Sequence, residues 1–297
     1  MQIEACKIFR DLVDTKSFSK AAAHNSITQS AVSQQLRALE ARFQVPLLER
    51  SSKRFALTRE GELFYQAARR IIKEYTDFCN VLSELRKVVS GSLRVATVYS
   101  IGLHELPPYL KKFLREYPQV KVHVEYRRSN QVYDDVLEGA SDIGLVAYPT
   151  GRKSLKIEPF REDRLVVICA PQHPLSKHQE ITLSALRPYK LIGFEPDIPT
   201  RRAVDKILRA ENIEIQTVME FDNIETVKRA VEIDAGIAIV PRATVEQEAK
   251  NGTLHIIEFK GKPYYRPLGI IYLSGRVLSP AMRKFIETLQ GPAPVDM

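Results

Sequence analysis

The sequence predicts an α/β protein that begins with a small all-α unit and continues through one long helix. Three observations lead to this fold class: short helical patterns in residues 1–58, an unbroken apolar repeat over 59–90, and alternating strand and helix patterns over 91–297. Strands that alternate with helices favour a parallel sheet with helices on its faces. We therefore divide the chain at these boundaries.

In the first unit, two short helices are predicted back to back. Ser19 is expected to cap a helix over Lys20–His24, because a serine hydroxyl accepts from backbone N–H groups that lack partners in the first turn. A second helix, Gln29–Phe43, begins after Ser26, which stands at capping-box spacing to Gln29, or after Thr28, which is an alternative cap. A helix over residues 3–13 precedes the pair.

The second of these helices has one apolar and one polar face. Val32, Leu36, Leu39 and Phe43 recur at helical spacing and are expected to be buried on one face. Amide, hydroxyl and guanidinium groups can pair with base edges in a major groove, as helix-turn-helix units do. The outer face that we expect to contact double-stranded DNA consists of Gln29, Ser30, Ser33, Gln34 and Arg37. The alternative is an ordinary surface helix with a solvated face.

A small hairpin with a basic tip is predicted after Leu47. Its tip contains Arg50, Lys53 and Arg54, which could reach an adjacent phosphate backbone or minor groove. Three helices and a hairpin make a winged helix-turn-helix unit.

The long helix over residues 59–90 has the repeat of a coiled-coil seam. Thr58 is a plausible cap for it. Its apolar residues alternate spacings of four and three: Phe64, Ala68, Ile71, Tyr75, Phe78, Leu82, Leu85 and Val89. This predicts a helix that pairs with a second copy of itself. The alternative is that it packs on the later domain of its own chain.

Composition and charge fit a soluble protein that binds an anionic polymer. The chain has 297 residues, 44% hydrophobic and 27% charged, and a formal net charge of +8. Residues 1–90 hold 15 Lys and Arg against 10 Asp and Glu, and the remainder holds 29 against 26. The first third thus carries most of the excess, as a phosphate-binding segment would, although a basic surface can also serve solubility.

Several classes of protein are disfavoured. There is no secretory leader and no apolar run near the ~18 residues of a membrane span, so we expect a cytoplasmic protein with no membrane partner. Cys6, Cys79 and Cys169 are few and far apart, and the histidines lack metal-ligand spacing, so we expect no metal and no cofactor. The chain has no phosphate loop, nucleophile elbow or dinucleotide fingerprint, so we expect no enzyme.

Strand and helix patterns then alternate to the end of the chain, without an internal repeat. Strands are predicted at 93–98, 120–126, 143–146, 155–160, 165–170, 191–194, 215–221, 237–240 and 267–272, and helices at 107–117, 131–138, 200–210, 224–235 and 280–289.

Taken together, the motifs resemble the LysR-type transcriptional regulators over essentially the whole chain. The likeness rests on QSAVSQQLRALEARFQVPLLERSSKRFALTREGE, GSLRVATVYSIGLHELP, SDIGLVAYP, TVKRAVEIDAGIAIVP and RPLGIIY. The resemblance implies an effector domain of two α/β subdomains of periplasmic-binding-protein type. Residues 91–147 and 268–290 would form the first and 148–267 the second, with crossings near Ala147–Pro149 and Arg266–Pro267.

The resemblance also implies roles for individual residues. Gln29, Ser30, Ser33 and Gln34 would face the major groove, and the tip residues would make the wing contacts. Ser30 stands where many relatives have proline, and Gln34 where many have arginine, which leaves the preferred operator open.

An effector site is expected between the two subdomains. Ser100 follows the first strand, where ligand crevices of parallel sheets lie, and Thr200 begins a helix whose N–H groups attract anions. Our hypothesis is a small anionic effector, such as a carboxylate, sulfur or phosphate compound, that binds among Tyr99, Ser100, Ile101, Asn130, Phe194, Thr200 and Asn223. The alternative is that the polar members are only helix caps.

The function expected is therefore a sequence-specific transcriptional regulator that is switched by a small molecule. Its implied partners are DNA, the effector, RNA polymerase and further copies of itself in a homodimer or homotetramer. A redox effector is disfavoured, because the effector domain offers only Cys169. The rival is a cytoplasmic solute-binding protein without regulatory DNA binding.

Overall fold

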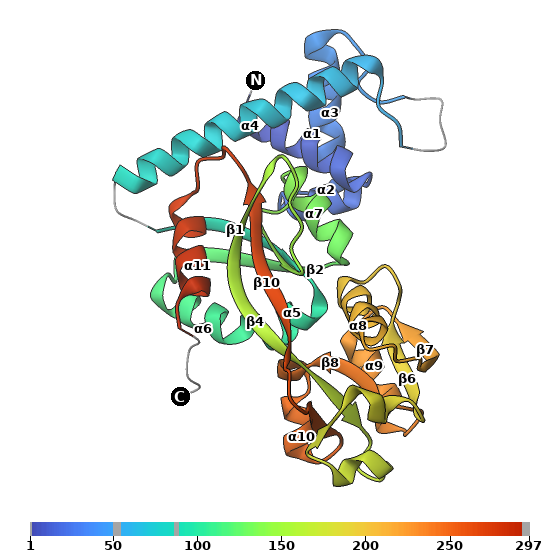
Figure 1. Ribbon diagram of the computed structural model, residues 1–297. Coiled ribbons are helices and arrows are strands. Elements are labelled where there is room, and N and C mark those ends of the chain that lie inside the picture. The colour runs from blue at the N-terminus through green and yellow to red at the C-terminus, as the bar shows by residue number, and fades with distance from the viewer. Residues whose placement is uncertain (1, 50–54, 86–88, 293–297) are drawn as a thin grey trace. The chain divides into compact units, whose positions relative to one another are not determined.

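The computed structural model describes residues 2–49, 55–85 and 89–292. The chain separates into two compact units, Met1–Val88 and Val89–Met297, which are described separately (Figure 1). The fold is the expected one, a helical head and long helix followed by an α/β unit. Among the described helices, none combines the length and apolar character needed to span a bilayer.

The head contains helices α1 (Ile3–Thr15), α2 (Phe18–His24), α3 (Gln29–Phe43) and α4 (Arg59–Leu85). The span predicted for α3 is confirmed, and Thr28 caps it by accepting from the Ala31 N–H at 3.2 Å. The cap predicted for α2 is wrong. Ser17 caps that helix, because α2 already begins at Phe18, which leaves Ser19 inside the first turn.

Two apolar clusters hold the head together. In one, Leu12 of α1 packs with Val32 of α3, and in the other Phe9 packs with Leu39 and Leu47. The burial predicted for Phe43 is wrong: it is the last residue of α3 and remains 43% exposed, although its ring packs on Phe64 with 5.4 Å between centroids. The hairpin begins as predicted, with an antiparallel bridge between Leu48 and Leu57. Its predicted basic tip, Arg50, Lys53 and Arg54, lies outside the described residues.

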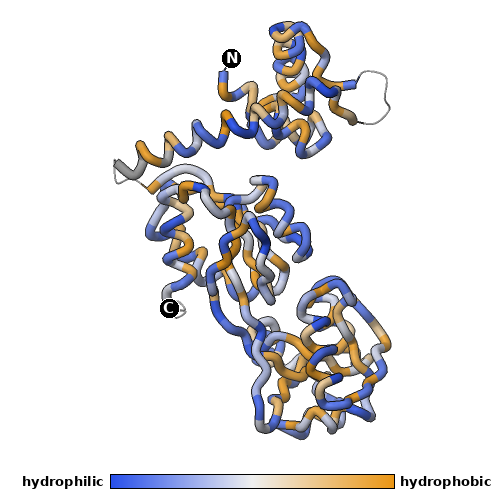
Figure 2. The backbone as a smooth tube through the Cα atoms, turned by 45° about the horizontal axis from the view of Figure 1, so that its top comes forward, coloured by the Kyte–Doolittle hydropathy of each residue, from blue (hydrophilic) through white to orange (hydrophobic). Residues whose placement is uncertain are grey.

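The apolar residues of helix α4 form two groups, one buried against α1 and one exposed. The hydroxyl of Thr58 caps it as predicted, accepting from the Gly61 N–H at 2.9 Å. Ala68 is buried with Ile72 and Cys6 against α1. Farther along, where hydrophobic and hydrophilic residues alternate in Figure 2, four side chains of the predicted seam are 39 to 58% exposed: Ile71, Tyr75, Phe78 and Leu82. The side chain of Leu85 lies outside the described ones.

The second unit is built on a curled, mixed sheet with strand order β2-β1-β3-β10-β4-β9-β5, in which β8 also pairs with β4, and on a two-stranded sheet β6-β7. The strands are β1 (Gly91–Thr97), β2 (Val120–Tyr126), β3 (Ile143–Ala147), β4 (Leu155–Cys169), β5 (Glu180–Ile181), β6 (Lys190–Phe194), β7 (Gln216–Phe221), β8 (Ala238–Pro241), β9 (His255–Phe259) and β10 (Tyr264–Leu273). The helices are α5 (Tyr99–His104), α6 (Leu106–Glu116), α7 (Ser129–Leu137), α8 (Pro199–Ala210), α9 (Ile224–Glu232), α10 (Glu246–Asn251) and α11 (Pro280–Gln290).

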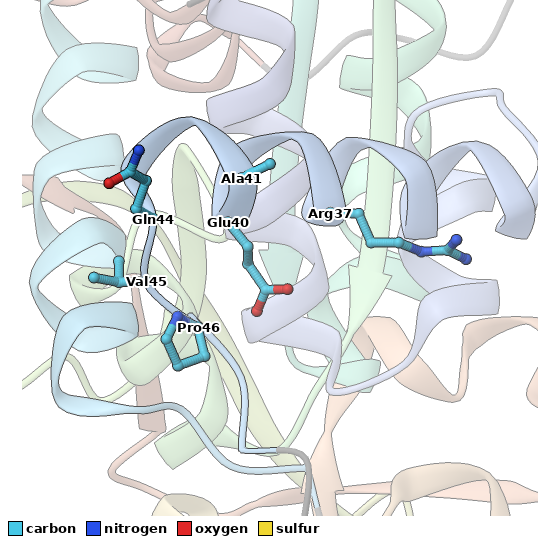
Figure 3. Close-up of a pocket in the computed structure, with 6 residues that line it drawn as sticks. All are labelled: Arg37, Glu40, Ala41, Gln44, Val45 and Pro46. Carbon is cyan, nitrogen blue, oxygen red and sulfur yellow. The ribbon is translucent and has the colours of Figure 1, made fainter.

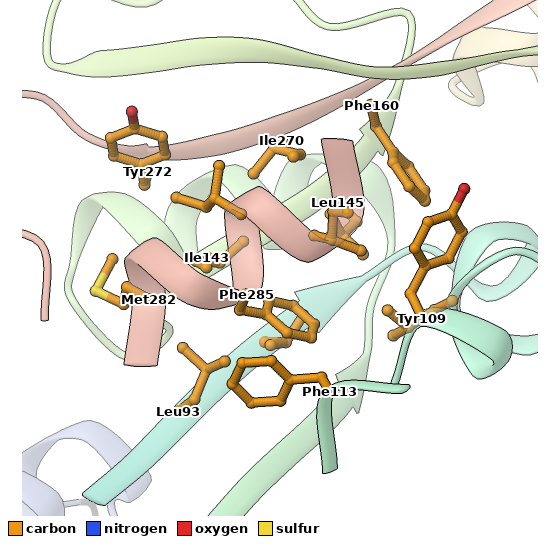
Figure 4. Close-up of a cluster of buried hydrophobic side chains, with 14 of the residues drawn as sticks. Leu93, Tyr109, Phe113, Ile143, Leu145, Phe160, Ile270, Tyr272, Met282 and Phe285 are labelled. Carbon is orange, nitrogen blue, oxygen red and sulfur yellow. The ribbon is translucent and has the colours of Figure 1, made fainter. Parts of the chain in front are cut away.

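The first lobe is the parallel sheet β2-β1-β3 with β10 antiparallel beside β3. Helices α6 and α11 cover one face, where Phe113 meets Phe285 edge to face at 5.0 Å between ring centroids (Figure 4). Helix α7 covers the other face through Val132, Tyr133 and Val136. This core therefore combines residues from the beginning of the second unit, in β1 and α6, with residues from its end, in β10 and α11.

The crossing between lobes differs from the expected one. Strand β4 is a single strand of 15 residues, whose first part pairs with β10 in the first lobe and whose last part pairs with β8 and β9 in the second. Leu155 and Phe160 accordingly belong to the first lobe's core. The first crossing therefore lies within β4, opposite Arg266 and Pro267, and not at 147–149.

The second lobe has β6 and β7 parallel, followed by α8 and α9 respectively. Ile192 and Phe194 of β6 pack with Val227 and Val231 of α9 in one core cluster. Both lobes thus present helix beginnings at the carboxyl ends of parallel strands.

Candidate functional site

The outer face of α3 is open. Gln29, Ser30, Gln34 and Arg37 are exposed, and Ser33 is half-buried. Two of the five polar groups have local partners, since the Ser19 hydroxyl donates to Gln29 Oε1 at 3.2 Å and Ser30 lies 2.8 Å from the Thr28 hydroxyl. In the described part of the chain the side chains of the other three make no hydrogen bond. This face can therefore offer amide, hydroxyl and guanidinium groups to base edges.

A shallow depression lies beside the C-terminal half of α3, lined by Arg37, Glu40, Ala41, Gln44, Val45 and Pro46 (Figure 3). Glu40 points across it toward the loop, and its Oε1 accepts from the Leu47 N–H at 2.8 Å. This contact ties the start of the hairpin to α3. Sequence reasoning missed Glu40, because its neighbours in the helix carry no signal that its partner is a backbone amide seven residues later.

In the second unit, polar contacts join the facing edges of the two lobes. Arg128, which precedes α7, donates to Glu195 at 2.7 Å and lies 3.4 Å from Asp197 and 3.5 Å from Asp222. His104, at the end of α5, lies 2.8 Å from Glu225 of α9. The predicted effector residues are distributed around these contacts, on the same strand ends.

Ser100 is half-buried in the first turn of α5 and contacts a buried arginine. Arg266 Nη1 donates to Ser100 Oγ at 2.9 Å, while its Nη2 donates to Asp163 at 3.0 Å. The guanidinium is only 1% exposed, and its Nε has no hydrogen-bond partner among the described residues. From the sequence, Arg266 is predicted only to mark a crossing between the subdomains, and its one signal is an arginine directly before the apolar run Pro267–Tyr272.

A buried carboxylate, Glu105, lies near the Arg266 and Asp163 pair. Glu105 is 4% exposed and pairs with Arg161 at 2.9 Å. Burial raises the pKa of Glu105, and the nearby Asp163 adds to the rise, whereas Arg161 opposes it. Burial also lowers the pKa of Arg266, against the opposing influence of Asp163, but a guanidinium stays protonated in proteins.

The neighbours of Ser100 have different surroundings. Tyr99 is 41% exposed and stacks on Tyr126, with ring centroids 5.4 Å apart. Ile101 is fully buried in the first lobe's core. Gly102 is required here, because a Cβ would lie 2.5 Å from Thr97 and 2.7 Å from the Tyr126 ring.

The other predicted residues also differ in accessibility. Asn130 is exposed in the first turn of α7, and Thr200 is buried in the first turn of α8. Phe194 packs in the second lobe's core. Asn223 is engaged as a helix cap: its Oδ1 accepts from the Glu225 and Thr226 N–H groups, and its Nδ2 donates to Asp222.

Metal and thiol chemistry find no support in the described residues. No group of three His, Cys, Asp or Glu side chains there could hold a metal ion. Burial raises the pKa of the Cys169 thiol to about 12, which disfavours the reactive thiolate.

Two family models match the chain. The model described as "Bacterial regulatory helix-turn-helix protein, lysR family" matches residues 3–62, and the model described as "LysR substrate binding domain" matches residues 86–292. The first covers the head and the second covers most of the chain.

Individual relatives agree with these models. A probable RuBisCO transcriptional regulator of Thalassiosira pseudonana is 30% identical over 277 residues, which are 91% of this chain and 90% of the relative. The regulatory domain of Synechocystis CcmR in complex with 2-PG is 25% identical, with a TM-score of 0.62, over 68% of this chain and 96% of that one. Full-length CbnR complexed with its target DNA is 20% identical, with a TM-score of 0.66, over 98% and 99%, which supports the fold alone.

Proposed function

This chain belongs to the LysR family of transcriptional regulators, and from that premise we propose that a small anionic effector, bound between its two lobes, switches its action on DNA. It is a DNA-binding regulator with an effector-binding domain and not an enzyme. The helix-turn-helix match removes the reason for considering a solute-binding protein without DNA binding.

The observation that carries the effector proposal is the set of contacts between the lobes. Arg128, which precedes α7 on the first lobe, donates to Glu195 on the second, and His104 at the end of α5 lies 2.8 Å from Glu225 of α9. Strands β4 and β10 connect the two lobes. A ligand that binds one arrangement of the lobes better shifts the population toward it by its differential affinity. The 2-PG bound by the CcmR domain supports an anion as the effector class.

For DNA, we assign the base-reading role to Gln29, Ser30, Ser33, Gln34 and Arg37, and the backbone contacts of the wing to Arg50, Lys53 and Arg54. The open outer face of α3 supports the first assignment. Each bidentate base contact contributes roughly 1 to 3 kcal/mol of discrimination. Phosphate contacts make binding weaken with salt, at a log-log slope near ~0.9 per neutralised phosphate.

We also assign a homodimer or homotetramer and a contact with RNA polymerase to this function. The exposed apolar surface of α4, with Tyr75 and Phe78 at its centre, supports self-association. Paired heads read two half-sites, so a change in their spacing alters binding and DNA bending.

Fluorescence anisotropy on a duplex from upstream of the protein's own gene tests the proposal. The chain is titrated onto that duplex and onto a scrambled one over a salt series, with and without 2-PG as the probe. We expect preferential and salt-steep binding to the native duplex, and a shift of the binding curve by the probe or another anion. Equal binding to both duplexes, or indifference to every small anion tried, contradicts the proposal.

A further inference from the structure

The two polar contacts that join the facing edges of the lobes differ in how they respond to pH. Arg128 reaches Glu195 with a guanidinium, which stays charged in proteins. His104 reaches Glu225 with an imidazole, at 2.8 Å between Nε2 and Oε1. Histidine is the residue type that ordinarily gains or loses its charge between about pH 5 and 8. We call the arrangement of the lobes in which both contacts are made the joined arrangement.

The carboxylate that meets His104 is held in place by its own lobe. Oε1 of Glu225 also lies 3.0 Å from Nζ of Lys228, which is only 1% exposed. The same ammonium donates to the Thr244 carbonyl at 3.1 Å and to Glu248 at 2.7 Å. A lysine has three donors, so Lys228 is fully partnered within the second lobe. Glu225 is thus anchored from behind and presents its carboxylate to the first lobe.

The charges around this contact do not balance within the second lobe. Lys228 contributes one positive charge, and its partners Glu225 and Glu248 contribute two negative ones. Oε2 of Glu248 is buried and has no hydrogen-bond partner among the described residues. Burial acts to raise the pKa of Glu225, but the contacts with Lys228 and His104 outweigh it, so that pKa lies below its usual value. An ionised Glu225 therefore attracts a cation from the first lobe.

The other ionisable groups on the elements packed against α5 are already engaged or face away. Those elements are α6, β2, β3 and the 3-10 turn Arg242–Thr244, and β3 has no ionisable residue. On β2, residues 121, 123 and 125 alternate with the side that faces α5. The remaining contacts are Glu105 and Tyr109 with Arg161, Arg242 with Glu258 and Glu246, Tyr126 stacked on Tyr99, and, on α9, Arg229 with Glu232.

Both charge states of the imidazole can make the contact, but with unequal strength. Because an ionised carboxylate only accepts, Nε2 of His104 must carry a proton and donate to Glu225. In the neutral ring this requires the tautomer with its proton on Nε2. In the protonated ring the same bond also joins two opposite charges, which adds a Coulomb attraction. A protonated His104 therefore holds the joined arrangement more firmly than a neutral one.

From these contacts we propose that His104 and Glu225 form a proton-dependent latch between the lobes, so that the response to the effector depends on pH. The inference rests on the proposed function, since the effector is proposed to bind between the same lobes. A proton on His104 is attracted to Glu225 only in the joined arrangement, which therefore gains population as the pH falls from about 8 to about 5. An effector that prefers the joined arrangement then binds more tightly at the lower pH.

Single-molecule energy transfer between two dyes follows the lobes in the full chain, without effector or DNA. The dyes are attached at Lys111→Cys on α6 and Lys206→Cys on α8, both exposed positions, in a Cys79→Ser background, since Cys6 and Cys169 are buried. Unlabelled chain is added in excess, so that transfer within one chain is measured. We expect the ratio of joined to separated lobes to rise about fivefold between about pH 8 and about pH 5.5.

Three variants separate the latch from other effects of pH. Arg128→Gln weakens the neighbouring contact, and we expect it to lower the joined population at both pH values, which identifies that population, while the fivefold rise remains. His104→Gln keeps an amide donor for Glu225 but cannot titrate, and we expect it to remove the rise. His123→Gln changes an exposed histidine of β2 and is the matched control, which should leave the rise unchanged.

Two results would overturn the inference. One is a labelled chain, without these three changes, whose lobe populations do not shift with pH. The other is a shift of the same size in His104→Gln, because the titrating group would then lie elsewhere. Neither result bears on the regulator proposal, which the anisotropy assay on DNA with 2-PG judges at a single pH.

Discussion

The outer face of α3 and the facing edges of the two lobes are both polar, yet they are built in opposite ways. On α3 the polar groups lie on one helix and are largely unpartnered, as with Gln34 and Arg37. At the lobe edges they come from distant segments and are already engaged, as with Ser100 on Arg266 and Asn223 on its own helix. A surface prepared for a large partner can stay open, whereas a small-molecule site must be held in shape by internal contacts.

The largest expected effect tests whether the two regions are independent. Phe9→Ala removes a ring that is 1% exposed and packs edge to face on Phe64. We expect it to destabilise the head by about 4 kcal/mol, and calorimetry should show the head's transition alone moving down. Phe43→Ala, which is 43% exposed, is the matched control and should cost far less. A single unfolding transition shared by the head and the second unit would show that the two are not independent.

The next prediction concerns Asp142, a buried carboxylate of the first lobe whose partners, unlike those of the polar groups on α3, lie within the fold. It is 6% exposed, accepts from the Arg94 N–H, and pairs with Arg276 at 2.9 Å. Burial acts to raise its pKa, but the two arginines outweigh this, so the pKa of Asp142 lies below its usual value. We expect Asp142→Ala to cost about 3 kcal/mol at pH 7.

The sign of its pH dependence follows from that shift. A carboxyl with a lowered folded-state pKa stabilises the fold above its unfolded pKa of about 4, and the stability is lost as pH falls further. When the pH is lowered below about 4, the denaturant concentration at the unfolding midpoint of the second unit should therefore decrease in the unsubstituted chain. The decrease should be smaller in Asp142→Asn. The exposed Asp134, paired with Arg152, provides the control, and Asp134→Asn should leave the acid limb of the curve unchanged.

On α3, Gln34→Ala should reduce discrimination between the native and scrambled duplexes by about 2 kcal/mol, because the base contact proposed for Gln34 is lost. Gln35→Ala is the matched control, since Gln35 faces α1 beside Ile8 and Leu12. Competition anisotropy measures both. Equal losses on specific and random DNA would place Gln34 on phosphates instead.

The smallest effect concerns Asn223, the predicted effector residue that is engaged as a cap. We expect Asn223→Ala to cost about 1 kcal/mol of stability, and Asn223→Asp, which preserves the cap, to cost little. Thermal unfolding measures this, and sulfate titration of both variants asks whether Asn223 is also a ligand. A loss of sulfate affinity in both would show that the amide reaches the anion.

The features that could be predicted from the sequence are those that depend on local periodicity. The span of α3 and the alternation of the α/β unit followed from repeats of apolar residues. Strand β4 was read as two strands, because the charged run Arg161–Arg164 interrupts its apolar pattern, yet its backbone keeps pairing with β10. The role of Arg266 could not be predicted, because Ser100 is 166 residues away and only the tertiary fold brings them together.

The order in which the elements leave the ribosome gives the split first lobe a temporal consequence. The head is contiguous within Met1–Val88, but the first lobe is closed by β10 and α11, where Leu268 pairs with Ala147 and Phe285 meets Phe113. Domains fold largely as units during synthesis, the N-terminal one first. A nascent chain can therefore acquire a DNA-reading head well before it acquires a lobe that senses an effector, so regulation is the last property to emerge.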